Sequence, residues 1–498
     1  MRPRIVVICL ATLAVMNVAA SATAESAQTA VTTGTPEHVY DSRQLQHDFQ
    51  QMYRGLQEAS FDLYAFTPKA ELNRLYVEAL ASFDRPLTLL QAKTRFERFV
   101  ATVRMGDTRV DSPVPEWTKF LQAGGRSFPL GVRIISGRVY VTQNLSGVEA
   151  IGPGDELLSL NGEPMSRLLT RIARQVSAET DYLAQSLIEH DFSRYLWLER
   201  GAVEEFVLGV RHSAGQTDQV RVPARTETET QRQRARVPPI LDLESPPRTS
   251  RMLAGGVAYL RPGPFHNMQA RTASDQWDVS GFRQFIDRAF AAFAAAHADR
   301  LIIDLRDNPG GDEQFSDVML SWFASRPFRF ASQFKVRVSP ESIAANNALM
   351  AHGAADAGPM ARQYSALYSH AHVGDVVDLD IPMTPPRSEG RFTGKVFVMV
   401  DRQTFANAVA VAALIQDYKF GLILGEPTSD MASRYGVMEQ FTLRNTGLIV
   451  GYPTARIIRP NGDPRPRGVT PDVLISIPIV QAADDPVLAQ AIAIARSR

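Results

Sequence analysis

The second half of the chain alternates short apolar runs with helical patterns, and this alternation limits the possible fold more than any other feature. Four apolar runs carry it: GVAYLRP, RLIIDLR, GKVFVMV and GLILGE. Each run is short, continuous and bounded by Gly, Pro or charged residues, which is typical of strands buried on both faces. Helical patterns such as GFRQFIDRAFAAFAAAHA and NAVAVAALIQDYK lie between them. Residues 250–498 are therefore predicted to form an α/β core with parallel strands.

The residues before this core divide into two further parts. Over 40–115, Leu, Phe and Tyr recur three or four positions apart, which predicts an N-terminal helical subdomain. Over 116–228, runs such as GVRIISGRVYVTQN and EEFVLGVRHSAGQTDQVRVPA predict a β-rich domain with hairpins. The polar stretch 226–239 is expected to be a linker or an exposed loop. Within the core, 338–390 is expected to be a helical insertion or lid.

The N-terminus has the features of a signal peptide over residues 1–24. Arg2 and Arg4 precede an apolar run, and small residues lead up to Ala24. A transmembrane anchor is the alternative, and the polar residues that follow at once argue against it. We therefore expect an exported chain, periplasmic or secreted, without a membrane span after removal of the leader. The single cysteine, Cys9, lies in this segment, so the mature chain would have no disulfide and no thiolate site.

The charge balance gives no indication of a nucleic-acid partner. The chain has 53 Lys and Arg residues against 53 Asp and Glu residues, and no basic block stands out. At 498 residues, 45% of them apolar, it has ample material for a large core. These features predict a globular protein of several domains and make no prediction of its oligomeric state.

Two stretches of the core have the form of a catalytic site. In LIIDLRDNPGGD, a buried strand runs into Gly310 and Gly311, whose backbone N–H groups could face a ligand oxyanion because no Cβ blocks the approach. A plain loop is the alternative for a Gly-Gly turn taken alone. In DRQTFANAVAVAALIQDY, a strand and a tight turn precede an alanine-rich helix, with Ala406 at the turn.

The order of these blocks resembles the tail-specific protease family, also called the C-terminal processing peptidases. RLIIDLRDNPGG, TFANAVAVAALIQDY, GLILGEPT and RPNGDPRPRGVTPDV follow one another as in that family, over roughly 250–480. IGPGDELLSLNGEPM resembles the PDZ-type module that the family carries. The resemblance implies an exported serine hydrolase with a crotonase-like α/β core, and a PDZ-like domain that captures extended peptide ends. It implies no cofactor and no metal.

The catalytic residues of the family do not all transfer to this chain. The nucleophilic Ser of the family corresponds to Ala406, the Lys of its Ser-Lys branch to Met431, and the His of its other branch to Asp107. Glu426, in GEPT, is retained and could help to order the site, or could simply cap a strand or helix end. Because a serine hydroxyl and its base act as a unit, this set predicts lost or strongly impaired proteolysis.

Several alternatives remain open from the sequence. Ala406 could be an engineered change, or a rebuilt site could use Ser429, Ser433 or His266. His370 and His372 have a spacing that could bind a metal on a strand edge, although a surface turn is the simpler interpretation. Three functions therefore compete: a catalytically dead member that binds peptides or protein C-termini, an active serine peptidase, and an envelope adaptor. In the last of these, an extended peptide adds a strand to the open edge of the PDZ-like module.

Overall fold

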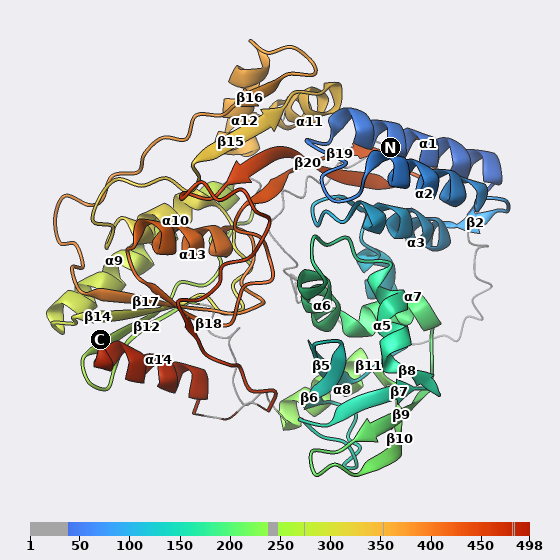
Figure 1. The fold of residues 1–498 in the computed structure, drawn as a ribbon, viewed down its shortest axis with the longest axis horizontal. Coiled ribbons are helices and arrows are strands. Elements are labelled where there is room, and N and C mark those ends of the chain that lie inside the picture. Colours follow the sequence, from blue (N-terminus) through green and yellow to red (C-terminus); the bar gives the residue numbers. More distant parts are fainter. Residues whose placement is uncertain (1–37, 238–247, 273, 352, 481, 483) are drawn as a thin grey trace, which may run out of the picture.

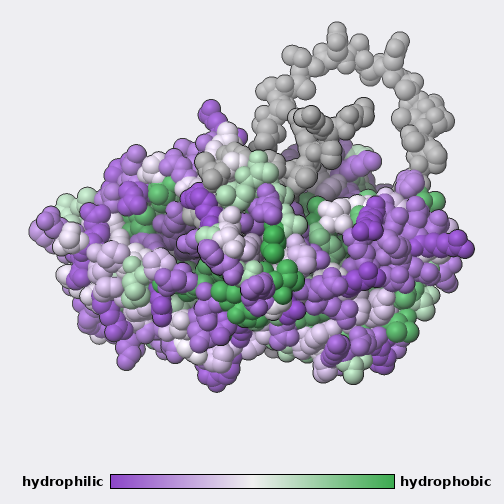
Figure 2. Space-filling model, turned by 90° about the horizontal axis from the view of Figure 1, so that it is seen from above, coloured by the Kyte–Doolittle hydropathy of each residue, from purple (hydrophilic) through white to green (hydrophobic). Residues whose placement is uncertain are grey.

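The computed structural model describes residues 38–237, 248–272, 274–351, 353–480, 482 and 484–498. Figure 1 shows an α/β part in yellow to red and a β-rich middle part in green. The N-terminal helices, in blue, lie beside the red hairpin β19–β20. The expected signal peptide lies outside the described residues. No described helix is long and apolar enough to cross a membrane. Hydrophilic side chains dominate the face in Figure 2, with apolar ones gathered near its middle.

A mostly parallel sheet organises the C-terminal half. Its strand order is β12-β13-β14-β17-β18-β21, and only β12 runs antiparallel to its neighbour. The four apolar runs of the sequence form β13, β14, β17 and β18, as predicted. The six strands are Thr249–Leu253, Val257–Arg261, Arg300–Asp304, Lys395–Val400, Leu422–Gly425 and Val473–Leu474.

Helices cover both faces of this sheet, which explains why its inner strands are largely apolar and buried. One face packs against α9 (Ser280–Ala295), α10 (Glu313–Leu320) and α13 (Asn407–Tyr418). The opposite face packs against α14 (Pro486–Ser497). The prediction of a parallel α/β core is confirmed. The loops at the carboxyl ends of β14 and β17 carry both glycines and Ala406, so the sheet brings the two catalytic-type stretches together.

A second sheet joins the core to the N-terminal helices. Its order is β16-β15-β20-β19, with β3 (Arg109–Val110) also paired to β20. The other strands are β15 (Gln333–Arg337), β16 (Val376–Asp378), β19 (Arg434–Thr442) and β20 (Ile449–Ile458). The helices α1 (Ser42–Ala59), α2 (Lys69–Ala81) and α3 (Leu89–Val100) share one apolar cluster with residues of β19–β20 and the turn between them. The expected helical insertion forms α11 (Pro340–Met350) and α12 (Ala354–Tyr368).

The middle part is a six-stranded sheet with helices, in which the short strand β8 (Glu163–Pro164) pairs only with β7. Its order is β10-β9-β7-β6-β5, so β5 is an edge strand. The strands are β5 (Leu130–Ile135), β6 (Arg138–Asn144), β7 (Glu156–Leu160), β9 (Glu205–Arg211) and β10 (Thr217–Pro223), with α5 (Met165–Ala173), α6 (Asp181–His190) and α7 (Phe192–Arg200) packed against them. Both predicted hairpins are present.

The expected linker at 226–239 is wrong over most of its length. Residues Glu227–Arg236 form the helix α8. The hydroxyl of Thr226 accepts from the N–H of Glu229, and the carboxylate of Glu229 accepts from the N–H of Thr226, which completes a capping box. A fully polar helix has no apolar periodicity, so only the Thr-x-x-Glu spacing could have indicated it.

Candidate functional site

Ala406 stands on a strained turn between β17 and α13. Its backbone has φ 48° and ψ −122°, a conformation that residues with a Cβ rarely adopt. Thr404 holds the turn: its hydroxyl donates to the carbonyl of Leu305 at 2.8 Å and accepts from the N–H of Asp401 at 3.0 Å. The turn therefore has the geometry of an elbow that presents one side chain at the start of a helix, and that side chain is a methyl group.

The two glycines allow the neighbouring loop to approach this turn. A Cβ on Gly310 would lie 2.8 Å from both the Cβ of Ala406 and the carbonyl oxygen of Phe405. A Cβ on Gly311 would lie 2.1 Å from the carbonyl oxygen of Phe265. The amide of Gly310 is not free, because it donates to Oδ1 of Asn308 at 2.9 Å. Gly310 therefore allows close backbone packing, and its donor already has a partner within the protein.

The backbone N–H of Ala406 is hydrogen-bonded to a carboxylate. Oδ2 of Asp430 accepts from the N–H of Ala406 at 2.6 Å, and Oδ1 accepts from the N–H of Met431 at 2.7 Å. Arg434 lies on the other side of the turn, where its Nη1 donates to the carbonyl of Ala406 at 3.2 Å. A carboxylate oxygen thus accepts from the N–H of the elbow residue itself, and backbone N–H groups near a nucleophile can serve an oxyanion in acyl-transfer enzymes.

Two further carboxyls lie beside Asp430. Burial, together with the charge of Asp430, raises the pKa of Asp107 to about 6, while Arg434 and Arg109 oppose the shift. Burial likewise raises the pKa of Glu179 to about 7, although its carboxylate accepts from the N–H of Gly106 at 3.0 Å. The loops before β3, before α6 and after β18 each supply one of these acids. Asp107 is therefore part of an acidic group with Glu179 and Asp430.

The residues at the other expected positions have structural partners. Met431 is buried in the apolar cluster of the middle part. The Ser429 hydroxyl is buried and donates to the carbonyl of Arg402 at 2.6 Å. The buried hydroxyl of Ser433 donates to the carbonyl of Asp463 and accepts from the N–H of Arg459. Both hydroxyls are engaged with backbone and neither adjoins a base.

The histidines do not complete a catalytic or metal site. Nδ1 of His266 is buried without a hydrogen-bond partner, and burial, with the charge of Arg248, lowers the pKa of this ring. His372 accompanies Asp375 on an exposed turn, at 3.6 Å. Across the described ranges, no group of three His, Cys, Asp or Glu residues could hold a metal ion.

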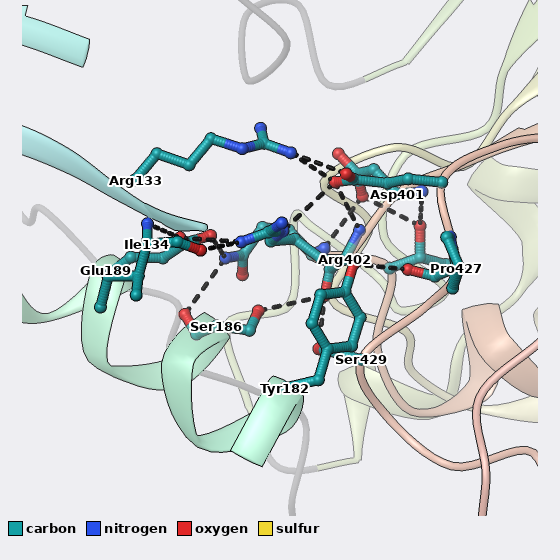
Figure 3. Close-up of polar contacts among 12 residues, drawn as sticks. Arg133, Ile134, Tyr182, Ser186, Glu189, Asp401, Arg402, Pro427 and Ser429 are labelled. Carbon is teal, nitrogen blue, oxygen red and sulfur yellow. Dashed lines mark hydrogen bonds and ion pairs between the residues drawn. The ribbon is translucent and has the colours of Figure 1, made fainter. Parts of the chain in front are cut away.

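Glu426 lies in an ionic cluster that joins the middle part to the core (Figure 3). Its carboxylate accepts from Nη2 of Arg133, on β5, at 2.7 Å, and from Nε of Arg402 at 3.3 Å. The side chain of Arg402 is more than nine-tenths buried, and that of Arg133 is somewhat less buried. Glu426 follows β18 directly, and its bonds link the two parts rather than cap a helix.

The same cluster occupies part of the edge of β5. The N–H of Ile134 donates to Glu189 on α6 at 2.8 Å, and its carbonyl accepts from Nη1 of Arg402 at 2.8 Å. Both edge groups of Ile134 are thus satisfied within the protein, as Figure 3 shows. The edge expected to be open is closed at this residue, and Arg402, which closes it, is four positions before Ala406.

Sequence reasoning missed the acidic and ionic neighbours of the elbow. Asp430 could have been noticed because it lies in GEPTSDM, next to the position of the family lysine. Glu179, Arg434 and Glu189 come from distant segments without a local pattern, so only the fold reveals them.

Comparison with known proteins agrees with this architecture. The model of Peptidase family S41 matches residues 257–475. The structure of mature CPAF is similar with a TM-score of 0.60 and 16% identity, over 87% of this chain and 92% of that one. The structure of mature CPAF complexed with lactacystin is similar with a TM-score of 0.62 and 16% identity, over 92% of this chain and 97% of that one. No curated protein matches the chain. Residues 257–475 of the chain thus match the S41, or tail-specific, family of peptidases, and the wider likeness to CPAF is one of fold.

Proposed function

We propose that this chain is an exported peptide-binding protein that keeps the tail-specific protease architecture and has lost proteolysis. The observation that carries the proposal is the elbow itself. It presents the methyl group of Ala406, its amide is bonded to Asp430, and Asp107 stands where the family has a histidine. A methyl group cannot attack a carbonyl, and acyl transfer needs both a nucleophile and a base.

The amide of Ala406 supports a binding role. In a complex, the carbonyl or terminal carboxylate of an extended peptide would replace Asp430 as the acceptor of this N–H. Release of Asp430 would leave its carboxylate close to Asp107, whose pKa is already raised by that charge. Because ligand binding must overcome an existing charge-assisted hydrogen bond, we expect modest affinity that favours strong acceptors such as a C-terminal carboxylate.

We further propose that the middle part is PDZ-like and takes peptide ends along β5. A bound strand would have to compete with Glu189 and Arg402 for the edge groups of Ile134. The core is proposed to be crotonase-like, in keeping with its parallel sheet and helices on both faces. Because Arg402 bonds to Ile134, a peptide bound along β5 would displace Arg402, and the position of Arg402 would in turn affect peptide binding.

A rebuilt hydrolase is the second candidate, and one observation favours it. Asp107 has a raised pKa beside Asp430, and two coupled carboxyls can share a proton and activate water. In that case cleavage would persist in the unmodified chain and would be lost in an Asp107→Asn variant. The first candidate predicts no cleavage in either protein.

The test compares cleavage of an unfolded protein by the mature chain, by Ala406→Ser, and by an Ala406→Ser, Asp107→His double variant. We expect none from the unmodified chain and measurable cleavage from the double variant alone. Binding is measured in parallel by calorimetry with an unstructured peptide and with its C-terminally amidated form. Preference for the free carboxylate supports the proposal, and absence of peptide binding contradicts it. Cleavage by the unmodified chain contradicts the loss of proteolysis.

A further inference from the structure

A group of buried polar side chains lies between the helical insertion and the hairpin β19–β20. Glu439 on β19 and Tyr452 on β20 are direct partners in the strand register, so their side chains lie on the same face of the hairpin. The helices α11 and α12 pack against each other, α11 also contacts β19, and Figure 1 shows both beside this hairpin. We call this region the tyrosine chamber; its members are Glu341, Ser342, Asn346, Tyr364, Tyr368, Glu439 and Tyr452.

Many polar atoms of the tyrosine chamber have no partner. The phenol oxygens of all three tyrosines make no hydrogen bond of good geometry, although Ser342 lies near those of Tyr368 and Tyr452. Nδ2 and Oδ1 of Asn346 and Oε2 of Glu341 are also without a partner. Asn346 and Tyr452 are 0% exposed, Tyr364 is 2% exposed, and Glu439 is 8% exposed. Buried polar groups in folded proteins are almost always paired, so a set of six unpaired atoms in one place indicates a missing partner.

The side chains of the tyrosine chamber converge from separate elements. On α11, Ser342 and Asn346 are one turn apart and both buried. On α12, Tyr364 and Tyr368 are also one turn apart, with their rings stacked at 5.8 Å. Ser342 lies close enough to the phenols of Tyr368 and Tyr452 to favour their ionised forms, and the charge of Glu439 acts on all three tyrosines. All three tyrosines therefore lie within electrostatic reach of Glu439.

The chemistry of the chamber favours a positively charged guest. Burial alone raises the pKa of Glu439 to about 8, so within the described part of the chain no cation compensates this carboxyl. Glu341 adds a second carboxyl, and it also acts on Tyr452. Carboxylates, an amide oxygen and phenol oxygens are all acceptors for N–H donors, and stacked tyrosine rings attract cations at their faces.

We propose that the tyrosine chamber binds one organic cation, an alkylammonium or guanidinium group, with Glu439 as its counter-ion. Glu341 and Tyr368 are only partly buried and form the rim, while Glu439, Tyr452 and Asn346 form the interior. The cation can belong to a lysine or arginine side chain of a bound peptide, or to a free amine. The chamber stands on its own contacts and does not depend on the proposed loss of proteolysis. If the source is a peptide, the chamber selects basic residues for the peptide-binding role.

The first experiment is calorimetric titration of the full mature chain with n-butylammonium, n-butylguanidinium and neutral n-butanol. We expect saturable binding of the two cations and none of the alcohol. Binding should release protons, detected as a heat that changes between buffers of different ionisation enthalpy, because the neutral carboxyl must ionise to pair with the cation. Equal response to the alcohol, or no saturable response to either cation, overturns the proposal.

Variants show whether the chamber is the site. Glu439→Gln keeps the shape and removes the charge, and should weaken cation binding by at least about tenfold. Tyr452→Phe keeps the ring and removes one acceptor, and should weaken binding by a smaller factor. Glu78→Gln, on the exposed face of α2, is the matched control and should bind as the unmodified chain does. Thermal unfolding of each variant verifies that it is folded, and an unchanged affinity in both chamber variants overturns the proposal.

A pair of peptides identifies the source of the cation. One unstructured peptide carries a single lysine and its partner carries norleucine at that position. Tighter binding of the lysine peptide, lost in Glu439→Gln, assigns the chamber to peptide side chains. Binding of the small cations without a preference between peptides assigns it to free amines. Binding of both peptides without any response to small cations contradicts the chamber and leaves the proposed peptide-binding function intact.

Discussion

The backbone N–H of Ala406 donates a 2.6 Å hydrogen bond to Oδ2 of Asp430. The turn that would present a nucleophile is therefore held by a carboxylate of the same chain, 24 residues later in sequence. Asp430 also accepts from the N–H of Met431, so one side chain fixes both the elbow and the start of its own loop. A residue at φ 48° is strained, and it persists because its surroundings hold it in place.

Removal of the Asp430 charge should loosen the elbow. An Asp430→Asn side chain keeps only one acceptor oxygen for two N–H groups, so we expect the free energy of unfolding to fall by ~1–3 kcal/mol. Urea unfolding measures this, with exposed Glu389→Gln as a control that should change little. The pKa of Asp107, followed by NMR, should move toward its ordinary value because one cause of its rise is gone. An unchanged pKa of Asp107 would show that the carboxyls of Asp107 and Asp430 do not interact.

The close approach at Gly310 should make it intolerant of any side chain. Gly310→Ala places a Cβ 2.7 Å from the amide nitrogen of Asn407 at a φ of 90°. Gly462→Ala is a matched control, because Gly462 has a φ of 81° and nothing within 4 Å of its Cβ position. Both variants carry the backbone strain, and only the first carries the clash. We expect Gly310→Ala to lose ~1–3 kcal/mol more stability than the control in urea unfolding. Equal losses would mean that the loop can move away.

The ion pair between Arg133 and Glu426 should hold the middle part against the core. Removal of one partner leaves the other charge largely buried, so Glu426→Gln should cost ~2–4 kcal/mol. An Arg133→Met, Glu426→Gln double variant should lose less than the sum of the single variants, because it leaves no unpaired charge. Chemical unfolding gives all three values. Additive losses would show that Arg402 alone pairs with Glu426.

The buried acids should make the fold less stable as pH rises. Burial raises the pKa of Glu439 to about 8 and that of Glu179 to about 7, both above their unfolded values. The folded state therefore binds more protons than the unfolded state between the unfolded and folded pKa values, and stability falls through that window. We expect the melting temperature to decrease as the pH rises from roughly 5 to roughly 8.

Two variants separate the contributions of these acids. Glu439→Gln should reduce the decrease up to about pH 8, and Glu179→Gln should reduce it only up to about pH 7. Differential scanning calorimetry across pH gives the slopes. A melting temperature that rises over this range would contradict the assignment of protonated acids in the folded state.

The strands of the core could be predicted from sequence because their signal is local. The run RLIIDLR has a continuous apolar centre, and β14 is buried on both faces. The helix α8 could not be found in this way, because its polar residues have no apolar face and only a capping box marks its start. The parallel pairing could be predicted because strands and helices alternate along the sequence, and this order can be read without knowing any contact.

The site was predictable only in part. Ala406, Gly310 and Asp107 could be placed because each stands in a recognisable block, but the bond from Asp430 to Ala406 depends on a turn that no block records. Glu426 could be singled out in GEPT, but its partner Arg133 lies 293 residues away in sequence. Contacts of that separation have no local signature, so the electrostatics around the elbow required the fold.

The attachment of the N-terminal helices to β19–β20 has a consequence for the order in which the chain acquires structure. Asp48 on α1 is buried and accepts from the backbone and side chains of Asn445 and Thr446, almost 400 residues later. Leu443, Leu448 and Val450 complete the same apolar cluster. The helices α1–α3 therefore cannot complete their core until β19 and β20, close to the C-terminal end of this sequence, have been synthesised. A nascent chain that ends before Asn445 would leave the buried carboxylate of Asp48 without these hydrogen bonds.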